Sequence, residues 1–264
     1  MKRDSRRLVR SALLAVAVTA VAACSNPLSG ASPATSPTAQ PAAPTATPAA
    51  EGDLAAAPEP TAVPTEPPPP SRAAPSASDA DRLAGIRSRT VVQDLGGRLV
   101  TVPGDVAAPG KGDVWRVKVQ VEKGLDVDGQ AFAQFVLDTL NDPRSWGHGG
   151  TRTFGRTDGG SYDVRVVLAS PATSARMCLP LRTNGRLSCR NGAASILTYY
   201  RWVKAIPGYG KDVTGYRRYV VNHEVGHALG HGHEDCPGRG RRAPVMMQQT
   251  KGLLGCEPNA WPHP

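Results

Sequence analysis

The chain has 264 residues, of which 25 are proline and 28 are glycine, and its formal net charge is +9 at pH 7. Residues 1–23 carry five Lys or Arg and one acid, so their removal would lower the charge to +5. No run of Lys and Arg interleaved with aromatic residues is present, which argues against a nucleic-acid-binding protein.

The N-terminal residues have the composition of an export signal. The basic stretch MKRDSRRLVR precedes the apolar run SALLAVAVTAVAA, which is too short for a permanent membrane-spanning helix. The tetrapeptide VAAC ends at Cys24 and fits a lipobox, whose cysteine receives a diacylglycerol before residues 1–23 are removed. Ordinary cleavage, which would leave Cys24 as an odd thiol, is the alternative. We expect an exported protein, either anchored by lipid to the outer face of the cytoplasmic membrane or extracellular.

The next segment is rich in Ala, Pro, Ser and Thr, as in SPATSPTAQPAAPTATPAA. Such a composition offers too little apolar surface to offset the entropy of ordering the chain. We therefore expect a disordered tether over residues 24–83. A single domain should follow over residues 84–264, which are enough for a core of its own.

Two patterns predict the first elements of this domain. Residues 115–121, WRVKVQV, alternate apolar and polar side chains, which predicts a strand with one buried face. The stretch DVDGQAFAQFVLDTLNDP places apolar residues at helical spacing. Asp128 is the expected N-cap, and Pro143 should end the helix soon after Asn141.

Further strands are expected at residues 151–157 and 162–169, around the turn Asp158-Gly159-Gly160. A hairpin should follow over residues 178–189, because Asn184-Gly185 is a strong hairpin turn. Another strand is expected at residues 194–200. The last helix should begin near Asp212 or Thr214. The order of elements indicates an α+β domain in which two helices lie on a mixed sheet.

Four cysteines lie in this domain, an even number that points to two disulfides in an exported protein. Four cysteines allow three connectivities. We expect Cys178 to pair with Cys189 across the Asn184-Gly185 turn, and Cys236 to pair with Cys256. No C-x-x-C pair is present, which argues against a four-cysteine zinc site.

The run HEVGHALGHGH, residues 223–233, holds four of the six histidines. In a helix, His223 and His227 lie one turn apart on the same face and can bind one metal ion. Three histidines along a straight helix would rise over about 12 Å, too far for one ion to contact His231 as well. A positive φ at Gly230 would end the helix and bring His233 back to the metal instead.

The pattern His223-Glu224-x-x-His227-x-x-Gly230-x-x-His233 resembles the zinc-binding stretch of the metzincin metallopeptidases, and the later APVMM resembles their Met-turn. Residues 222–262 are also similar to a family of secreted actinobacterial proteins with a metzincin-like domain, which would cover roughly residues 90–262. The resemblance implies a twisted mixed β-sheet with a backing helix and an active-site helix, ending in a Met-turn subdomain.

Roles follow from the resemblance where residues match. Three histidines would bind one catalytic Zn²⁺, Glu224 would be the general base, and Met246 would form the floor beneath the metal, with Met247 as the alternative. Glu234 resembles an acid of the astacin branch. Gln248 stands where astacins have a tyrosine that binds the metal or the transition state, so that role has no evident holder.

The sequence thus predicts a zinc metallopeptidase that hydrolyses peptide bonds with a zinc-activated water, and Glu224 as its base. Its expected partners are a protein or peptide substrate and, through Cys24, a membrane; no nucleic acid is expected, and the chain is expected to be monomeric. One alternative is a catalytically silent, zinc-stabilised binding module of the cell envelope. Another is a zinc amidase acting on peptidoglycan peptides. Glu224 argues against the binding module, because a structural zinc site has no need of a base.

Overall fold

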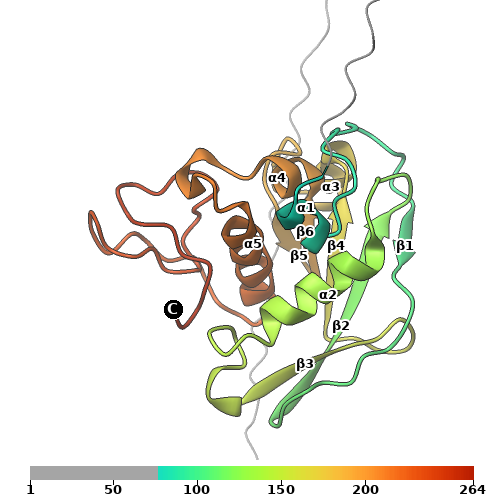
Figure 1. Ribbon diagram of the computed structural model, residues 1–264, viewed down its shortest axis with the longest axis horizontal. Coiled ribbons are helices and arrows are strands. Elements are labelled where there is room, and N and C mark those ends of the chain that lie inside the picture. The colour runs from blue at the N-terminus through green and yellow to red at the C-terminus, as the bar shows by residue number, and fades with distance from the viewer. Residues whose placement is uncertain (1–76) are drawn as a thin grey trace, which may run out of the picture. The chain divides into compact units, whose positions relative to one another are not determined.

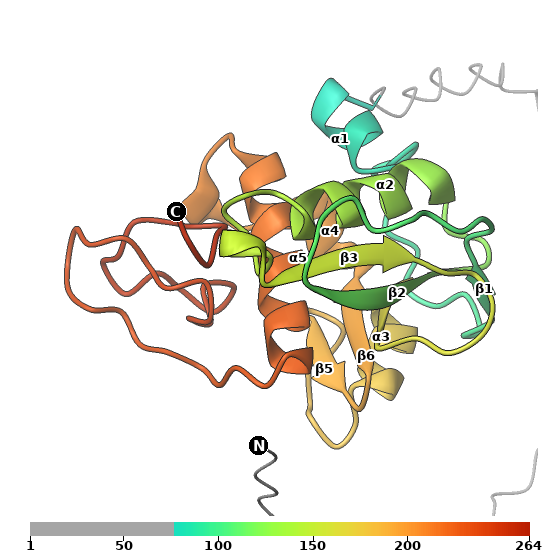
Figure 2. The ribbon, with the colours of Figure 1, turned by 90° about the horizontal axis from the view of Figure 1, so that it is seen from below.

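The computed structural model describes residues 77–264, which form a mixed α and β domain (Figures 1 and 2). The expected signal sequence, the lipidation at Cys24 and the expected tether up to residue 76 lie outside the described residues. Within the described range, no helix is both long and apolar enough to cross a bilayer.

Five α-helices and two 3-10 helices occur in the described part of the chain. The α-helices are α1 (Asp79–Leu83), α2 (Gly129–Leu140), α3 (Pro171–Met177), α4 (Tyr199–Lys204) and α5 (Val213–Ala228). The 3-10 helices are η1 (His148–Gly150) and η2 (Pro207–Tyr209). The expected order of one early and one late helix is present as α2 and α5, and the shorter helices were not expected.

The strands form one open, mixed sheet in the order β1-β2-β4-β6-β5, with β3 paired to β2 beside this path. They are β1 (Leu99–Thr101), β2 (Asp113–Glu122), β3 (Arg152–Arg156), β4 (Val164–Ala169), β5 (Cys189–Asn191) and β6 (Ala194–Thr198). Strands β2, β4 and β6 are parallel, and β1 and β5 run antiparallel to their neighbours at the two ends. The mixed sheet of an α+β fold is therefore confirmed.

The long strand and the early helix agree with the sequence patterns. In β2, Val117, Val119 and Val121 are buried, as the alternation predicted. The Asp128 side chain accepts hydrogen bonds from two backbone N–H groups in the first turn of α2, which makes it the N-cap. The helix ends at Leu140, and the side chain of its C-cap, Asn141, bonds to the backbone of Phe154 in β3 and so fixes α2 to the sheet.

The two strands expected around Asp158-Gly159-Gly160 do exist as β3 and β4, but they do not pair with each other. Both run parallel to β2, and Val117 pairs with Arg156 of β3 and with Val164 of β4. A strand residue with two partners has them on opposite edges. The connection from residue 157 to residue 163 therefore crosses from one edge of β2 to the other.

The hairpin expected over residues 178–189 is absent, although its turn is present. Asn184 and Gly185 both have positive φ, at 51° and 66°. The first arm is not a strand: α3 (Pro171–Met177) ends just before Cys178, and residues 178–180 form a turn. Both expected disulfides, Cys178–Cys189 and Cys236–Cys256, are present.

A strand was expected over residues 194–200, but β6 ends at Thr198 and Tyr199 begins α4. Tyr199 is buried in the core as the first residue of this helix. Trp202 of α4 donates a hydrogen bond from Nε1 to the carbonyl of Ala84 and contacts Phe132 edge to face, with ring centroids 5.3 Å apart.

The ordered domain begins before residue 84, the expected end of the tether. Ser78 caps α1, and Asp81 of α1 is fully buried. Its carboxylate accepts hydrogen bonds from Arg217 of α5 and from Arg89. Burial alone would raise the pKa of Asp81, but the hydrogen bonds and charges of the two arginines outweigh it and lower that pKa to about 2. Residues 79–83 are therefore part of the fold.

Helix α5 lies at the centre of the domain, where it contacts α2, β5 and β6 (Figure 1). It begins at Val213, near the expected start, and Asp212 caps it by accepting a hydrogen bond from the backbone N–H of Gly215. Most of its residues are buried, from Gly215 to Gly226. The segment after α5 has no regular helix or strand and lies beside it. A buried central helix holds its side chains rigidly, including those at its C-terminal end.

Candidate metal centre

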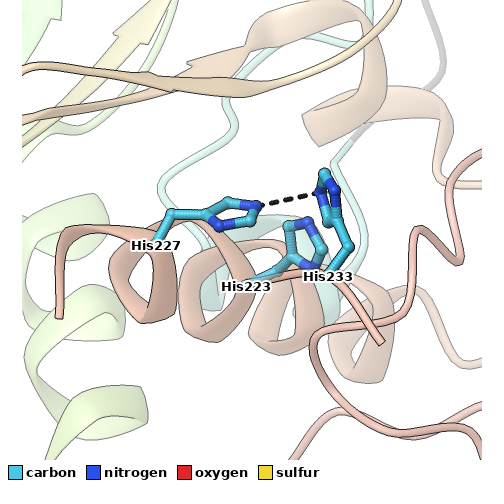
Figure 3. Close-up of side chains that lie close together, drawn as sticks. All are labelled: His223, His227 and His233. Atoms are coloured by element: carbon cyan, nitrogen blue, oxygen red, sulfur yellow. Dashed lines mark hydrogen bonds between the residues drawn. The ribbon is translucent and has the colours of Figure 1, made fainter. Parts of the chain in front are cut away.

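Three histidines converge at the C-terminal end of α5 (Figure 3). One nitrogen each of His223, His227 and His233 lies within 4.8 Å of the other two, and no other His, Cys, Asp or Glu of the described residues joins this group. The Nε2 atoms of His227 and His233 are 3.1 Å apart. Two imidazole ligands of a tetrahedral zinc ion lie roughly 3.3 Å apart. The donor set and its spacing therefore fit a divalent ion that prefers nitrogen ligands.

The turn after α5 explains how His233 reaches the other two rings. Gly230 has φ of +96°, and the N–H of His231 bonds to the carbonyl of Gly226 while the N–H of Gly230 bonds to that of His227. This pair of hydrogen bonds is a Schellman motif, which ends a helix and reverses the chain. The structure thus brings together the three histidines selected from sequence, by the turn that the glycine predicted.

The ring of His231 does not belong to the triad and stacks on Trp146, with ring centroids 4.3 Å apart. Its contribution is its backbone carbonyl, which lies 2.9 Å from Nδ1 of His227. The carbonyl of Val245 lies 2.9 Å from Nδ1 of His223 in the same way. Because a carbonyl can only accept, both Nδ1 atoms donate, and both neutral rings therefore present the lone pair of Nε2. The two carbonyls fix the tautomer that metal binding requires.

The environment also keeps the three imidazoles neutral. Burial, and to a lesser extent the neighbouring His227 and His233, lowers the pKa of His223 to about 3. Burial likewise lowers the pKa of His227 and of His233. At neutral pH all three rings hold a free lone pair, which is the form that binds metal.

Glu224 lies beside the triad without belonging to it. It is only 5% exposed, and burial raises its pKa to about 8. Its carboxylate lines the same cleft as the three histidines, a hollow of about 460 Å³. Its backbone carbonyl accepts a hydrogen bond from Ser195 of β6, which holds this turn of α5 against the sheet. A buried carboxylate that faces a cleft and lies next to a metal site is suited to accept a proton.

The methionine that packs against α5 is Met246 rather than Met247. Met246 is fully buried in the main core, and a Cβ built on Gly226 of α5 would lie 2.6 Å from its sulfur. Met247 belongs to a small separate cluster with the Cys236–Cys256 disulfide. The backbone of Met246 also accepts a hydrogen bond from the N–H of Glu234, directly after His233. Met246 therefore packs against the helix turn between His223 and His227, where Gly226 leaves room for it.

Sequence reasoning missed the groups around the triad. The two carbonyls at Val245 and His231 leave no trace in a sequence, because every residue has one. Three basic residues line the cleft, Arg182, Arg190 and Lys251. Glu234 is exposed, and its side chain makes no hydrogen bond to any residue between 77 and 264.

Comparison with known proteins identifies one family. The family described as "Protein of unknown function (DUF3152)" matches residues 89–260, from shortly after α1 to the C-terminal segment. No curated protein and no solved structure matches the chain.

Proposed function

We propose that this chain, which belongs to the DUF3152 family, is an exported zinc-dependent endopeptidase with a metzincin-like catalytic domain. The observation that carries the proposal is a triad of imidazole nitrogens with a buried carboxylate in the same cleft. Structural zinc sites use four protein ligands, whereas catalytic sites use three and leave one position for water or substrate. Among the described residues, this group has three.

His223, His227 and His233 would hold the ion. A bound Zn²⁺ supplies a Lewis acid, which makes water acidic and polarises the carbonyl of the scissile peptide. Neutral ligands leave the full charge of the dication available for this purpose. The hydrogen bonds from Nδ1 of His223 and of His227 to backbone carbonyls keep the two rings aimed at the ion and increase their basicity.

Glu224 would move the proton. Burial holds the pKa of Glu224 above its usual range, so it binds a proton more tightly than an exposed carboxylate does. The charge of a bound dication opposes this shift and returns the pKa toward the range in which a carboxyl group both accepts and releases protons at neutral pH. The carboxylate accepts the proton of the attacking water and then delivers it to the nitrogen of the leaving amine.

Incubation of the zinc-loaded chain with a peptide library derived from a proteome tests the proposal. We expect cleavage products in mass spectrometry, loss of cleavage with a chelator and recovery with zinc. Glu224→Ala should keep one zinc per chain and lose hydrolysis by a factor of about 10² to 10⁴. Intact turnover of this variant would exclude Glu224 as the base.

The same assay separates the alternatives. Release of peptides from peptidoglycan fragments, without cleavage of library peptides, would replace the peptidase by an amidase. A zinc-loaded chain that cleaves neither kind of substrate would support a zinc-stabilised binding module.

A further inference from the structure

The cleft over the histidine triad has a strongly one-sided charge. Its ionisable lining, apart from the histidines, consists of one acid, Glu224, and three basic residues, Arg182, Arg190 and Lys251. The acid is buried, whereas the three basic side chains are exposed. A substrate entering this cleft therefore meets positive charge from the protein, and a bound dication adds to it.

The three basic residues have no carboxylate partner within the described part of the chain. The ion pairs among the described residues involve other arginines. Some of those arginines are exposed and still have a carboxylate partner, such as Arg176 with Asp94 at 2.9 Å. Lys251 instead donates a hydrogen bond from Nζ to the side-chain oxygen of Gln248, at 3.0 Å. This contact orients the ammonium group without neutralising it, so the charge of Lys251 stays available to a ligand.

Two of these basic residues reach the cleft from different sides of the triad. Arg190 lies on the edge strand β5, which packs beside α5, and it lines the cleft together with His227. Lys251 lies in the segment after α5, and it lines the cleft together with His233. Positive charge thus lies close to two of the ligands, and it comes from two separate segments of the chain.

We propose that this cleft selects acidic peptides, with Asp or Glu side chains within a few residues of the bond that is cleaved. The proposal rests on the proposed peptidase function for the nature of the ligand. The charges of Arg182, Arg190 and Lys251 attract carboxylates and repel lysine and arginine side chains of a substrate. Glu224 does not cancel this field, because it is buried and acts at the metal site.

Peptide binding tests this preference without depending on turnover. The ligands are three fluorescent nine-residue peptides, identical except that the positions flanking the central bond carry Glu, Gln or Lys. Fluorescence anisotropy measures their binding to zinc-loaded Glu224→Gln. We expect the Glu peptide to bind about tenfold more tightly than the Gln peptide, as two exposed charge pairs would give, and the Lys peptide to bind most weakly. The differences should shrink as salt is added.

Charge reversal provides the matched comparison. Arg190→Glu combined with Lys251→Glu, in the Glu224→Gln background, should abolish the preference for the Glu peptide or reverse it. Lys111→Glu combined with Lys123→Glu changes the net charge equally at exposed positions outside the cleft, and should leave the order unchanged. Equal binding of the three peptides, or an equal effect of both double variants, would overturn the proposal.

The outcomes separate this inference from the proposed function. If the wild-type chain cleaves peptides equally whatever their charge, the proposed peptidase function is supported and the proposed preference for acidic peptides is wrong. If no peptide is cleaved but the Glu peptide binds most tightly, the cleft is an acidic-peptide site and the peptidase is wrong.

Discussion

Asp81→Ala should destabilise the domain severely, although residues 79–83 were expected to belong to a disordered tether. The guanidinium of Arg217 is fully buried, with Nη2 2.5 Å from Oδ1 of Asp81. Its other nitrogens donate to the carbonyls of Trp202 and Ala80, at 2.8 and 2.6 Å. Removal of the carboxylate leaves a buried cation without a counterion, which costs about 3 to 5 kcal/mol of unfolding free energy.

The pH dependence of stability gives a second, smaller value for the free energy contributed by the contact between Asp81 and the arginines. Arg217 and Arg89 lower the pKa of Asp81 from 3.8 to about 2, against the effect of burial. This shift corresponds to about 2 kcal/mol, which is fully present above pH 3.8 and is lost as the pH falls through 2. Protonation costs less than deletion because the neutral carboxyl group still accepts hydrogen bonds from the arginines.

Urea unfolding, followed by tryptophan fluorescence at several pH values, measures both effects. Asp79→Ala is the control, since this side chain lies in the same helix and is 94% exposed; we expect a change within about 0.5 kcal/mol. An Asp81→Ala variant within 1 kcal/mol of the wild type would refute the buried ion pair. The ion pair would also be refuted if the wild type and Asp81→Ala lost the same unfolding free energy between pH 4 and pH 2.

Two other substitutions test the packing around the histidine triad and in the segment that follows it. Gly226→Ala places a Cβ 2.6 Å from both the sulfur of Met246 and the ring of Trp146. Although alanine usually stabilises a helix relative to glycine, this clash should lower the unfolding free energy by about 1 to 3 kcal/mol. Thermal unfolding with and without zinc measures this, and a raised melting temperature would show that Met246 does not pack there. Replacement of Cys236 and Cys256 together by serine opens a loop with a sequence separation of 20 and should cost about 3 kcal/mol in urea unfolding. A loss below 1 kcal/mol would show that the bond contributes little.

The elements predicted correctly are those that depend on local pattern. The alternation of Val117, Val119 and Val121 identifies β2, the Asp128 cap locates the start of α2, and α5 begins near Asp212 as expected. The short helices were missed because distant contacts stabilise them. Asp81 of α1 depends on a residue 136 positions away, and nothing near α1 in sequence indicates that partner.

The pairing of β3 and β4 could not be predicted either, because it also depends on contacts distant in sequence. Residues 151–157 and 162–169 have strand composition and a glycine turn between them, which in sequence is the pattern of a hairpin. Both strands pair with β2 instead, in parallel. Parallel pairing joins segments far apart in the chain, and local turn residues carry no information about it.

In the candidate site, the sequence identifies side chains that a single helix and its terminal turn bring together. His223 and His227 follow from helical spacing, and His233 follows from Gly230. The groups that orient and surround them come from elsewhere. The carbonyl of Val245 lies 22 residues beyond the ring that it fixes, and Arg190 reaches the cleft from an edge strand.

The metal content of the purified chain tests the central claim most directly. After equilibration with zinc and removal of excess metal, we expect one zinc per chain in the wild type and in His231→Ala, because alanine retains the carbonyl that holds His227. His233→Ala should lose the stoichiometric metal. A wild-type chain without bound zinc, or a His233→Ala variant that retains zinc while His231→Ala loses it, would contradict the account.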